Sequence, residues 1–225
     1  MRRHDLAWLA PDAAALARLS GASCTPEHTA RTLLGGWIRC GHPLIVTRQP
    51  PGSGAEISLG LALPPARGKA RLAFLVPLAG VLRTSAPPAL ASVCERLPAT
   101  WQPKLRALLA SREVAGAAPR VYGSAAMQVV TGEPCLGPAS DLDLRLAPPT
   151  WAAAVTVAAA LARIDETVTG PRLDGEIWNP DGVAVAWREL AMRPERVLTK
   201  SRTRVELLAA TTFAASFASF ARVAC

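Results

Sequence analysis

Apolar residues recur along the chain with two spacings, one typical of helices and one typical of strands. Residues 5–19 alternate apolar and small side chains at helical spacing, and Asp12 is placed to cap a helix start. Glu27 to Ile38 predicts a second short helix that ends near Gly35-Gly36. Three short runs rich in apolar residues follow and predict a small antiparallel sheet. They are Pro43 to Thr47, Ile57 to Leu63 and Leu72 to Val76.

A group of prolines interrupts the pattern in the middle of the chain. They fall within residues 85–98, where we place a domain boundary. From Trp101 onward apolar residues return at helical spacing. We therefore expect an N-terminal α+β domain over residues 1–92 and a second domain, which carries the chemistry, over residues 93–225.

The most informative pattern in the second domain is a strand, a turn, a helix and then an acidic strand. Val121-Tyr122 ends an apolar strand, Gly123-Ser124 provides a tight turn, and Ala125 to Val130 predicts a helix. Asp141 and Asp143 alternate with leucines further along the chain. A strand therefore places both carboxylates on one face and the leucines on the other.

This pattern can hold a divalent cation and a triphosphate together. Two carboxylates on one strand face repel each other unless a cation lies between them. Mg²⁺ (or Mn²⁺) is held by such oxygen ligands together with substrate phosphates. Backbone N–H groups of Gly123 and Ser124, at a helix N-terminus, would bind phosphate. The alternative is a solvated acidic strand edge, but the combined layout favours a nucleotidyltransferase-type site with Asp141 and Asp143 as its catalytic and metal-binding pair.

A third acid would help to hold metal or to activate the nucleophile. Asp174 and Glu176 share one face of a predicted strand, and both are candidates, with a slight preference for Asp174. Asp181 belongs to the turn that follows and is not a candidate. The fold class expected for the whole chain is α+β: a small N-terminal α+β domain, then a nucleotidyltransferase-like mixed β-sheet domain flanked by helices.

Composition narrows the class of protein further. The hydrophobic share of 50% allows a sizeable core, and the net charge of +8 suits either an ordinary basic surface or an anionic partner. With one Tyr, four Phe and no long basic run, a nucleic-acid partner is not expected. The five scattered cysteines argue against a disulfide framework or a zinc site and fit a reducing cytoplasm. We expect neither a signal peptide nor a membrane span.

Several segments together resemble the malonate decarboxylase holo-acyl-carrier-protein synthases, which are also called phosphoribosyl-dephospho-CoA transferases. The resemblance covers most of residues 4–200, and little of it extends past Lys200. In the N-terminal half it includes His4-Asp5-Leu6, Gly41-x-Pro43-Leu44, Leu63-Pro64 and Gly68-Lys69-x-Arg71. In the second half it includes Tyr122-Gly-Ser124, Thr131-Gly132-x-Pro134, Ser140-Asp-Leu-Asp-Leu144, Arg172-Leu-Asp-Gly-Glu176 and Pro180-Asp-Gly182.

The resemblance implies a substrate and an acceptor. The substrate would be 2'-(5''-triphosphoribosyl)-3'-dephospho-CoA, the acceptor a serine of the apo acyl-carrier subunit of malonate decarboxylase, and the by-product pyrophosphate. By similarity Asp141 and Asp143 form the catalytic pair, and Lys69 and Arg71 are candidates for binding the substrate's phosphates or the carrier. Lys69 and Arg71 also fit a solvated basic loop.

Two other functions remain open at this point. The first is another Mg²⁺-dependent nucleotidyltransferase that acts with ATP on a small molecule or a protein, since the acidic strand alone suits both. The second is a basic, non-enzymatic nucleic-acid-binding module, whose support is the net charge.

Overall fold

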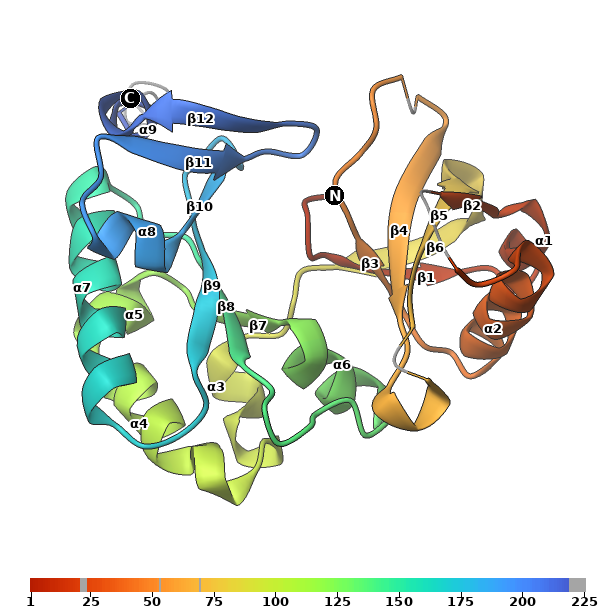
Figure 1. Ribbon diagram of the computed structural model, residues 1–225, viewed down its shortest axis with the longest axis horizontal. Coiled ribbons are helices and arrows are strands. Elements are labelled where there is room, and N and C mark those ends of the chain that lie inside the picture. Colours follow the sequence, from red (N-terminus) through yellow and green to blue (C-terminus); the bar gives the residue numbers. More distant parts are fainter. Residues whose placement is uncertain (21–23, 53, 69, 219–225) are drawn as a thin grey trace. The chain divides into compact units, whose positions relative to one another are not determined.

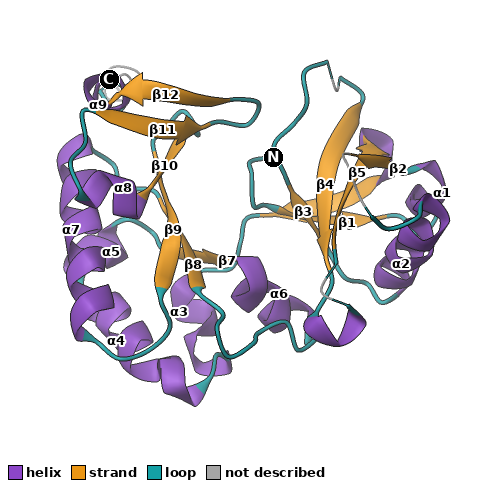
Figure 2. Cartoon of the chain, in the orientation of Figure 1, coloured by secondary structure: helices purple, strands orange, loops and turns teal. Residues whose placement is uncertain are grey.

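The chain folds into two compact units, each built around its own sheet (Figure 1 and Figure 2). The computed structural model describes residues 1–20, 24–52, 54–68 and 70–218. One unit consists of Met1–Pro87 and Val130–Gly137, and the other of Pro88–Val129 and Pro138–Cys225. Both units combine helices with a sheet, so the expected α+β fold class is confirmed.

The N-terminal unit contains an antiparallel sheet with the strand order β2-β5-β4-β3-β1-β6. Its strands are β1 (Leu6–Leu9), β2 (Arg18–Ser20), β3 (Leu44–Val46), β4 (Glu56–Ala62), β5 (Arg71–Pro77) and β6 (Val81–Ser85). Its helices are α1 (Ala13–Leu16) and α2 (Glu27–Arg39), with 3-10 turns at Pro65–Arg67 and Leu78–Gly80. Leu34 and Trp37 of α2 are fully buried, so this amphipathic helix anchors the core of the unit.

The prediction of a helix near the start of the chain is wrong for most of its length. Residues 5–19 contain strand β1, the single-turn helix α1 and the start of β2. The backbone of β1 pairs with β3 on one side and β6 on the other, and these pairings outweigh local spacing. Asp12 does precede α1, but its side chain makes no capping hydrogen bond. The predicted helix from Glu27 is confirmed and continues through Gly35-Gly36.

The C-terminal unit contains a mixed sheet with the strand order β12-β11-β10-β9-β8-β7. Its strands are β7 (Arg120–Tyr122), β8 (Leu142–Leu146), β9 (Leu173–Trp178), β10 (Ala184–Ala186), β11 (Arg196–Lys200) and β12 (Val205–Ala209). Its helices are α3 (Leu90–Val93), α4 (Gln102–Ala110), α5 (Arg112–Gly116), α6 (Gly123–Thr131), α7 (Trp151–Thr167), α8 (Trp187–Ala191) and α9 (Ala210–Ala215), with 3-10 turns at Cys94–Arg96 and Ala99–Trp101. Val183 to Trp187, after the turn at Asp181, predicts a returning strand, but β10 ends at Ala186 because Trp187 begins α8.

Strands β8 and β9 are the parallel pair of this sheet, and α7 is the crossover between them (Figure 1). The Thr150 hydroxyl accepts the backbone N–H of Ala153 and caps the start of α7. Small and branched apolar residues of α7 are buried, which lets the helix approach the sheet closely. Leu142, Leu144 and Leu146 of β8 are fully buried on the face opposite the acids, as the alternation predicts.

Close contact between the two strands explains a glycine in β9. Gly175 has φ +135°, and a Cβ placed on it would lie 2.0 Å from the backbone oxygen of Leu144. A side chain at this position would force the two strands apart. The Leu-Asp-Gly-Glu segment therefore carries a glycine because the parallel pairing needs one between its two acids.

A buried ion-pair network connects three helices to the start of β9. Lys104 Nζ lies 2.9 Å from Asp165 Oδ1, and Arg188 Nη2 lies 2.5 Å from Asp165 Oδ2. The same Asp165 carboxylate accepts the backbone N–H of Leu173 at 2.8 Å. Burial raises the pKa of Asp165, but these three donors outweigh that effect and hold the pKa below its ordinary value.

The end of the described chain packs against α7. Trp151, Phe213 and Phe217 form an aromatic cluster with ring centroids 5.5–6.1 Å apart, and Phe213 and Phe217 are buried. The helical spacing of Phe213, Phe217 and Phe220 in the sequence predicts a core face. The burial of Phe213 and Phe217 agrees with this prediction, and Phe220 lies outside the described residues. The cysteines at positions 24, 40, 94 and 135 are free thiols.

We expect Asp165→Asn to lower the free energy of unfolding by about 2–4 kcal/mol at pH 7. The substitution leaves Lys104, whose side chain is 4% exposed, without a charged partner. Since the folded-state pKa is lowered, this stabilisation is complete above the ordinary carboxyl pKa and is lost as pH falls through the folded value. Urea unfolding should show the difference from wild type at pH 7 and a smaller difference near pH 3.

Glu166→Gln removes the same charge from the neighbouring, exposed position and is the matched control. It should change stability little at either pH. An Asp165→Asn protein as stable as the control at pH 7 would contradict the structural role of this network.

Candidate active site

The acidic strand β8 lies between β7 and β9, next to one edge of the second sheet. Asp141 directly precedes β8, and Asp143 is its second residue, so both project from the face opposite the buried leucines. Arg145 continues the same face and is buried, with its guanidinium 5.0 Å from the ring centre of Trp178. The polar face of β8 therefore becomes more buried along the strand, and its two acids are at the accessible end.

The parallel register places a third acid beside this pair. Asp143 is the register partner of Asp174, and Arg145 is the partner of Glu176. Register partners on neighbouring strands share one face, so Asp143 and Asp174 are adjacent. Glu176 lies further along β9 than Asp174, and its side chain is only 6% exposed. Its carboxylate lies 3.3 Å from Lys200 Nζ. Of the two candidates for third acid, Asp174 is the one brought alongside Asp143.

The turn at Gly123 meets Asp143 directly. Tyr122, at the end of β7, is the register partner of Asp143, and α6 begins at the next residue. Gly123 has φ +66°, and a Cβ on it would lie 2.0 Å from Asp143 Oδ2. The carboxylate thus lies against the first residue of a helix, where the helix dipole favours negative charge. Ser124, the second residue of α6, is half-buried beside it.

One basic residue joins two of the acids. Arg172 donates from Nε to Asp141 Oδ1 at 3.0 Å and from Nη2 to Asp141 Oδ2 at 2.5 Å. The same Nη2 lies 3.8 Å from Asp174 Oδ2. The hydrogen bond with Asp141 raises the pKa of Arg172 further above its ordinary value. Sequence reasoning gave Arg172 no role, although its place directly before β9, the strand of Asp174 and Glu176, was a signal.

The carboxylates fit a hard divalent cation by their chemistry. A single guanidinium nitrogen contacts Asp141 and Asp174, so the oxygens of these two acids already converge on one positive centre. Carboxylate oxygens are the ligands that Mg²⁺ and Mn²⁺ prefer, and one or two suffice when phosphates complete the shell. Among the described residues no three His, Cys, Asp or Glu side chains are arranged as a metal-binding group.

The other predicted substrate-binding residues belong to the N-terminal unit. Arg71 is exposed at the start of β5 and is the register partner of Ala62. Lys69 lies outside the described residues. Of these two candidates, the structure therefore describes only Arg71.

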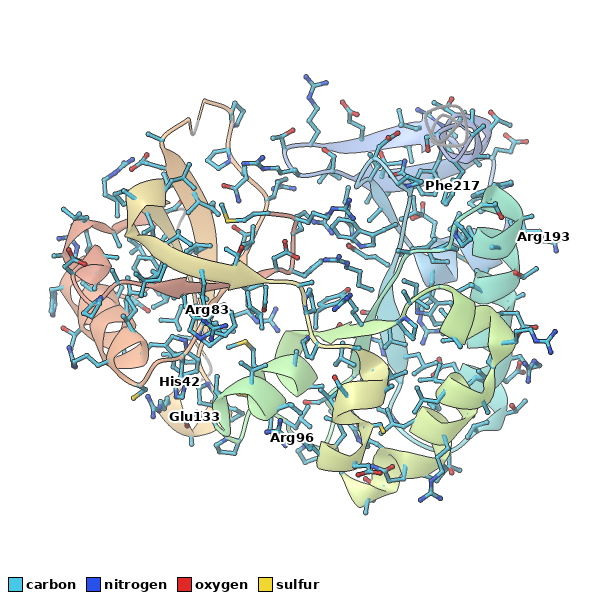
Figure 3. The ribbon with its side chains drawn as sticks, turned by 180° about the vertical axis from the view of Figure 1, so that it is seen from behind. His42, Arg83, Arg96, Glu133, Arg193 and Phe217 are labelled. Carbon is cyan, nitrogen blue, oxygen red and sulfur yellow. The ribbon has the colours of Figure 1, made fainter. Side chains whose placement is uncertain are left out.

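An ion-paired cluster in the N-terminal unit includes Glu133, which belongs to the segment Val130–Gly137 between α6 and β8. The side chains of His42 and Glu133 lie beside each other (Figure 3), with His42 Nε2 3.6 Å from Glu133 Oε1. Arg67 pairs with the same oxygen at 2.5 Å. The ring of Trp37 contacts His42 edge-on, with centroids 4.7 Å apart. Two motifs that are far apart in the sequence, around Arg67 and around Glu133, therefore meet in one ion-paired cluster.

The described helices include none with both the length and the apolar character needed to cross a membrane.

Comparison with known proteins agrees with this architecture. Residues 2–87 match the model of the phosphoribosyl-dephospho-CoA transferase MdcG N-terminal domain, and residues 89–211 match that of the C-terminal domain. A phosphoribosyl-dephospho-CoA transferase of Xanthomonas campestris pv. campestris (strain 8004) is 40% identical over 212 residues, which are 92% of this chain and 93% of the relative. The protein of the same name from Bradyrhizobium diazoefficiens is 38% identical, over 92% of this chain and 89% of its own length. No solved structure matches.

Transferases match this protein over almost the whole chain, which makes it a transferase enzyme. Its two units and its cluster of acids at a helix N-terminus agree with that class. The chain belongs to the phosphoribosyl-dephospho-CoA transferase family. The resemblance noted from its motifs is confirmed.

We expect Gly123→Ala to reduce the transferase rate by at least about 100-fold, because the new methyl group displaces the Asp143 carboxylate. The positive φ adds backbone strain of about 1–3 kcal/mol. Initial rates should be compared with urea unfolding of the same preparation. Gly182→Ala has similar strain, with φ +81°, but its added Cβ meets nothing within 4 Å. If both variants lost activity equally, backbone strain alone would explain the loss and the contact with Asp143 would not matter.

Proposed function

We propose that this enzyme transfers the phosphoribosyl-dephospho-CoA part of 2'-(5''-triphosphoribosyl)-3'-dephospho-CoA to a serine of the apo acyl-carrier subunit of malonate decarboxylase. Pyrophosphate is the second product. Membership of the transferase family supports the class of substrate. The observation that carries the site assignment is the contact between Asp143 and Gly123, since it joins the acidic strand to the N-terminus of α6.

The reaction is a phosphoryl transfer with one bond formed and one broken. The serine oxygen attacks the α-phosphorus, and the bond from that phosphorus to the oxygen that bridges it to the β-phosphorus breaks. The pyrophosphate leaves with the electron pair, and the hydroxyl proton passes to a carboxylate base. Positioning and charge neutralisation supply most of the rate in such reactions, which suits a site made of acids and backbone donors.

Each site residue has a proposed part in this chemistry. Mg²⁺ or Mn²⁺, when bound by Asp141 and Asp143, would supply positive charge to the phosphates. Backbone donors at Gly123 and the Ser124 hydroxyl bind phosphate oxygens at the start of α6. Asp174 completes the carboxylate group or accepts the serine proton; its exposure of 44% suits a residue that meets substrate. Glu176, paired with Lys200, is the weaker candidate for either part.

Lys69 and Arg71 would contact the CoA phosphates or the carrier. The exposure of Arg71 is compatible with either contact. The same proposal places the enzyme in the cytoplasm, where the five cysteines would remain reduced.

We expect Asp141→Asn and Asp143→Asn each to lower transfer by at least about 1,000-fold while the protein stays folded. Neither carboxylate is part of the buried core, so the free energy of unfolding should change little. Transfer rates and urea unfolding should be measured on each variant. Asp181→Asn, which removes an exposed acid from the β9–β10 turn, is the control. Substantial residual activity in a folded double variant would refute the assigned pair.

Mass spectrometry of the apo carrier subunit after incubation tests the substrate and the acceptor. With the triphosphoribosyl substrate, the carrier should gain one phosphoribosyl-dephospho-CoA group, and one pyrophosphate should appear per group attached. Replacement of the acceptor serine by alanine should abolish the gain. If ATP instead supported pyrophosphate release and modification of a protein or small molecule, the enzyme would be a different nucleotidyltransferase.

A further inference from the structure

Arg172 lies at the centre of the candidate active site although the proposed chemistry gives it no part. Its side chain contacts Asp141 through two nitrogens and approaches Asp174 with one of them. These are two of the acids proposed to hold a divalent cation or to meet substrate. A positive group of the protein therefore already neutralises Asp141, one of the two acids proposed to hold the metal, and approaches Asp174 beside it.

The ion pairs of Arg172 are exposed enough for the guanidinium to exchange its carboxylate partners for another anion. The Arg172 side chain is 57% exposed, and those of Asp141 and Asp174 are 30% and 44% exposed. Exposed pairs contribute little to stability because water competes for both partners. The Lys104–Asp165 pair of the same unit, with exposures of 4% and 13%, is the buried, structural contrast.

The backbone of Arg172 is held while its side chain is accessible. The Arg172 carbonyl accepts the N–H of Leu142 at 2.9 Å, which continues the pairing of β8 with β9. Because the Arg172 backbone is fixed, the guanidinium can move from the acids to a ligand beside them by rotation of the side chain alone. Its planar fork, which binds the Asp141 carboxylate through two donors, matches a phosphate group equally well.

We propose that Arg172 exchanges partners when substrate binds: it neutralises Asp141 and Asp174 in the free enzyme, and moves to the phosphates of the substrate as a divalent metal ion takes its place. This inference rests on the proposed triphosphate substrate and metal site. A guanidinium and a divalent cation compete for the same carboxylate oxygens, and their like charges repel each other. A triphosphate offers the displaced guanidinium a new anionic partner at once.

The exchange makes metal and triphosphate binding mutually dependent. Metal alone binds weakly, because it must displace Arg172 into solvent. Metal together with triphosphate binds more strongly, because the phosphates receive the guanidinium and also complete the metal's ligands. Arg172 thereby prevents the site from holding metal tightly without substrate.

Calorimetric titrations with Mn²⁺ and with inorganic tripolyphosphate test this without any measurement of activity. Arg172→Gln should bind Mn²⁺ alone about 3- to 10-fold more tightly than wild type, because a competing cation has gone. The same variant should bind tripolyphosphate, in the presence of Mn²⁺, at least about 10-fold more weakly, because a charged phosphate contact has gone. Arg172→Lys, which keeps the charge but loses the fork, should fall between the two in both titrations.

Arg106→Gln is the matched control, since it removes the same charge from an exposed position on α4. It should leave both affinities unchanged. Weaker or unchanged Mn²⁺ binding in Arg172→Gln would overturn the proposal, since Arg172 would then support the metal site or have no effect on it. Unchanged tripolyphosphate binding, or no Mn²⁺ binding by any variant, would overturn it as well. Failure of transfer to the carrier subunit would refute the proposed acceptor but would leave these two affinities as they are.

Discussion

The parallel pairing of β8 with β9 is the constraint on which the candidate active site depends. It makes Asp143 and Asp174 neighbours although they are far apart in the chain, and it places Glu176 a step further in, beside Lys200. The pairing requires α7 as a crossover and a glycine between the two acids of β9. The carboxylate of Asp165, near the end of α7, holds the first residue of β9 through its backbone N–H. Core packing and site geometry therefore share one set of contacts.

Much of this arrangement could be predicted from local pattern. The alternation of leucines and aspartates gave the two faces of β8, and the Gly-Ser turn gave the start of α6. The first residues were predicted wrongly, because β1 owes its conformation to strands β3 and β6, which lie far along the sequence. The register of β8 against β9 could not be predicted from the sequence either. Whether Asp174 or Glu176 lies beside Asp143 depends on how these two strands, which are far apart in the chain, align. The partner of Arg172 follows from that same alignment.

Two kinds of charged pair divide the work within the C-terminal unit. The Lys104–Asp165 pair is shielded from solvent and joins elements of the scaffold. The Arg172–Asp141 pair is open to solvent and lies among the acids of the site. Residue type does not distinguish the two pairs, since each joins a basic side chain to an aspartate. Burial distinguishes them, because an exposed charge that loses its partner is solvated by water, whereas a buried charge is left uncompensated.

The segment Val130–Gly137 constrains how chimeras of such proteins can be built. The two family models meet between residues 87 and 89, as if the halves were separable modules. By its contacts, however, this segment of the second half belongs to the first unit, where Glu133 pairs with Arg67. A chimera joined at residue 88 would thus bring together an arginine and a glutamate from different parents. A transplanted second half would keep this ion pair only if its new N-terminal half also carried a basic residue at the position of Arg67.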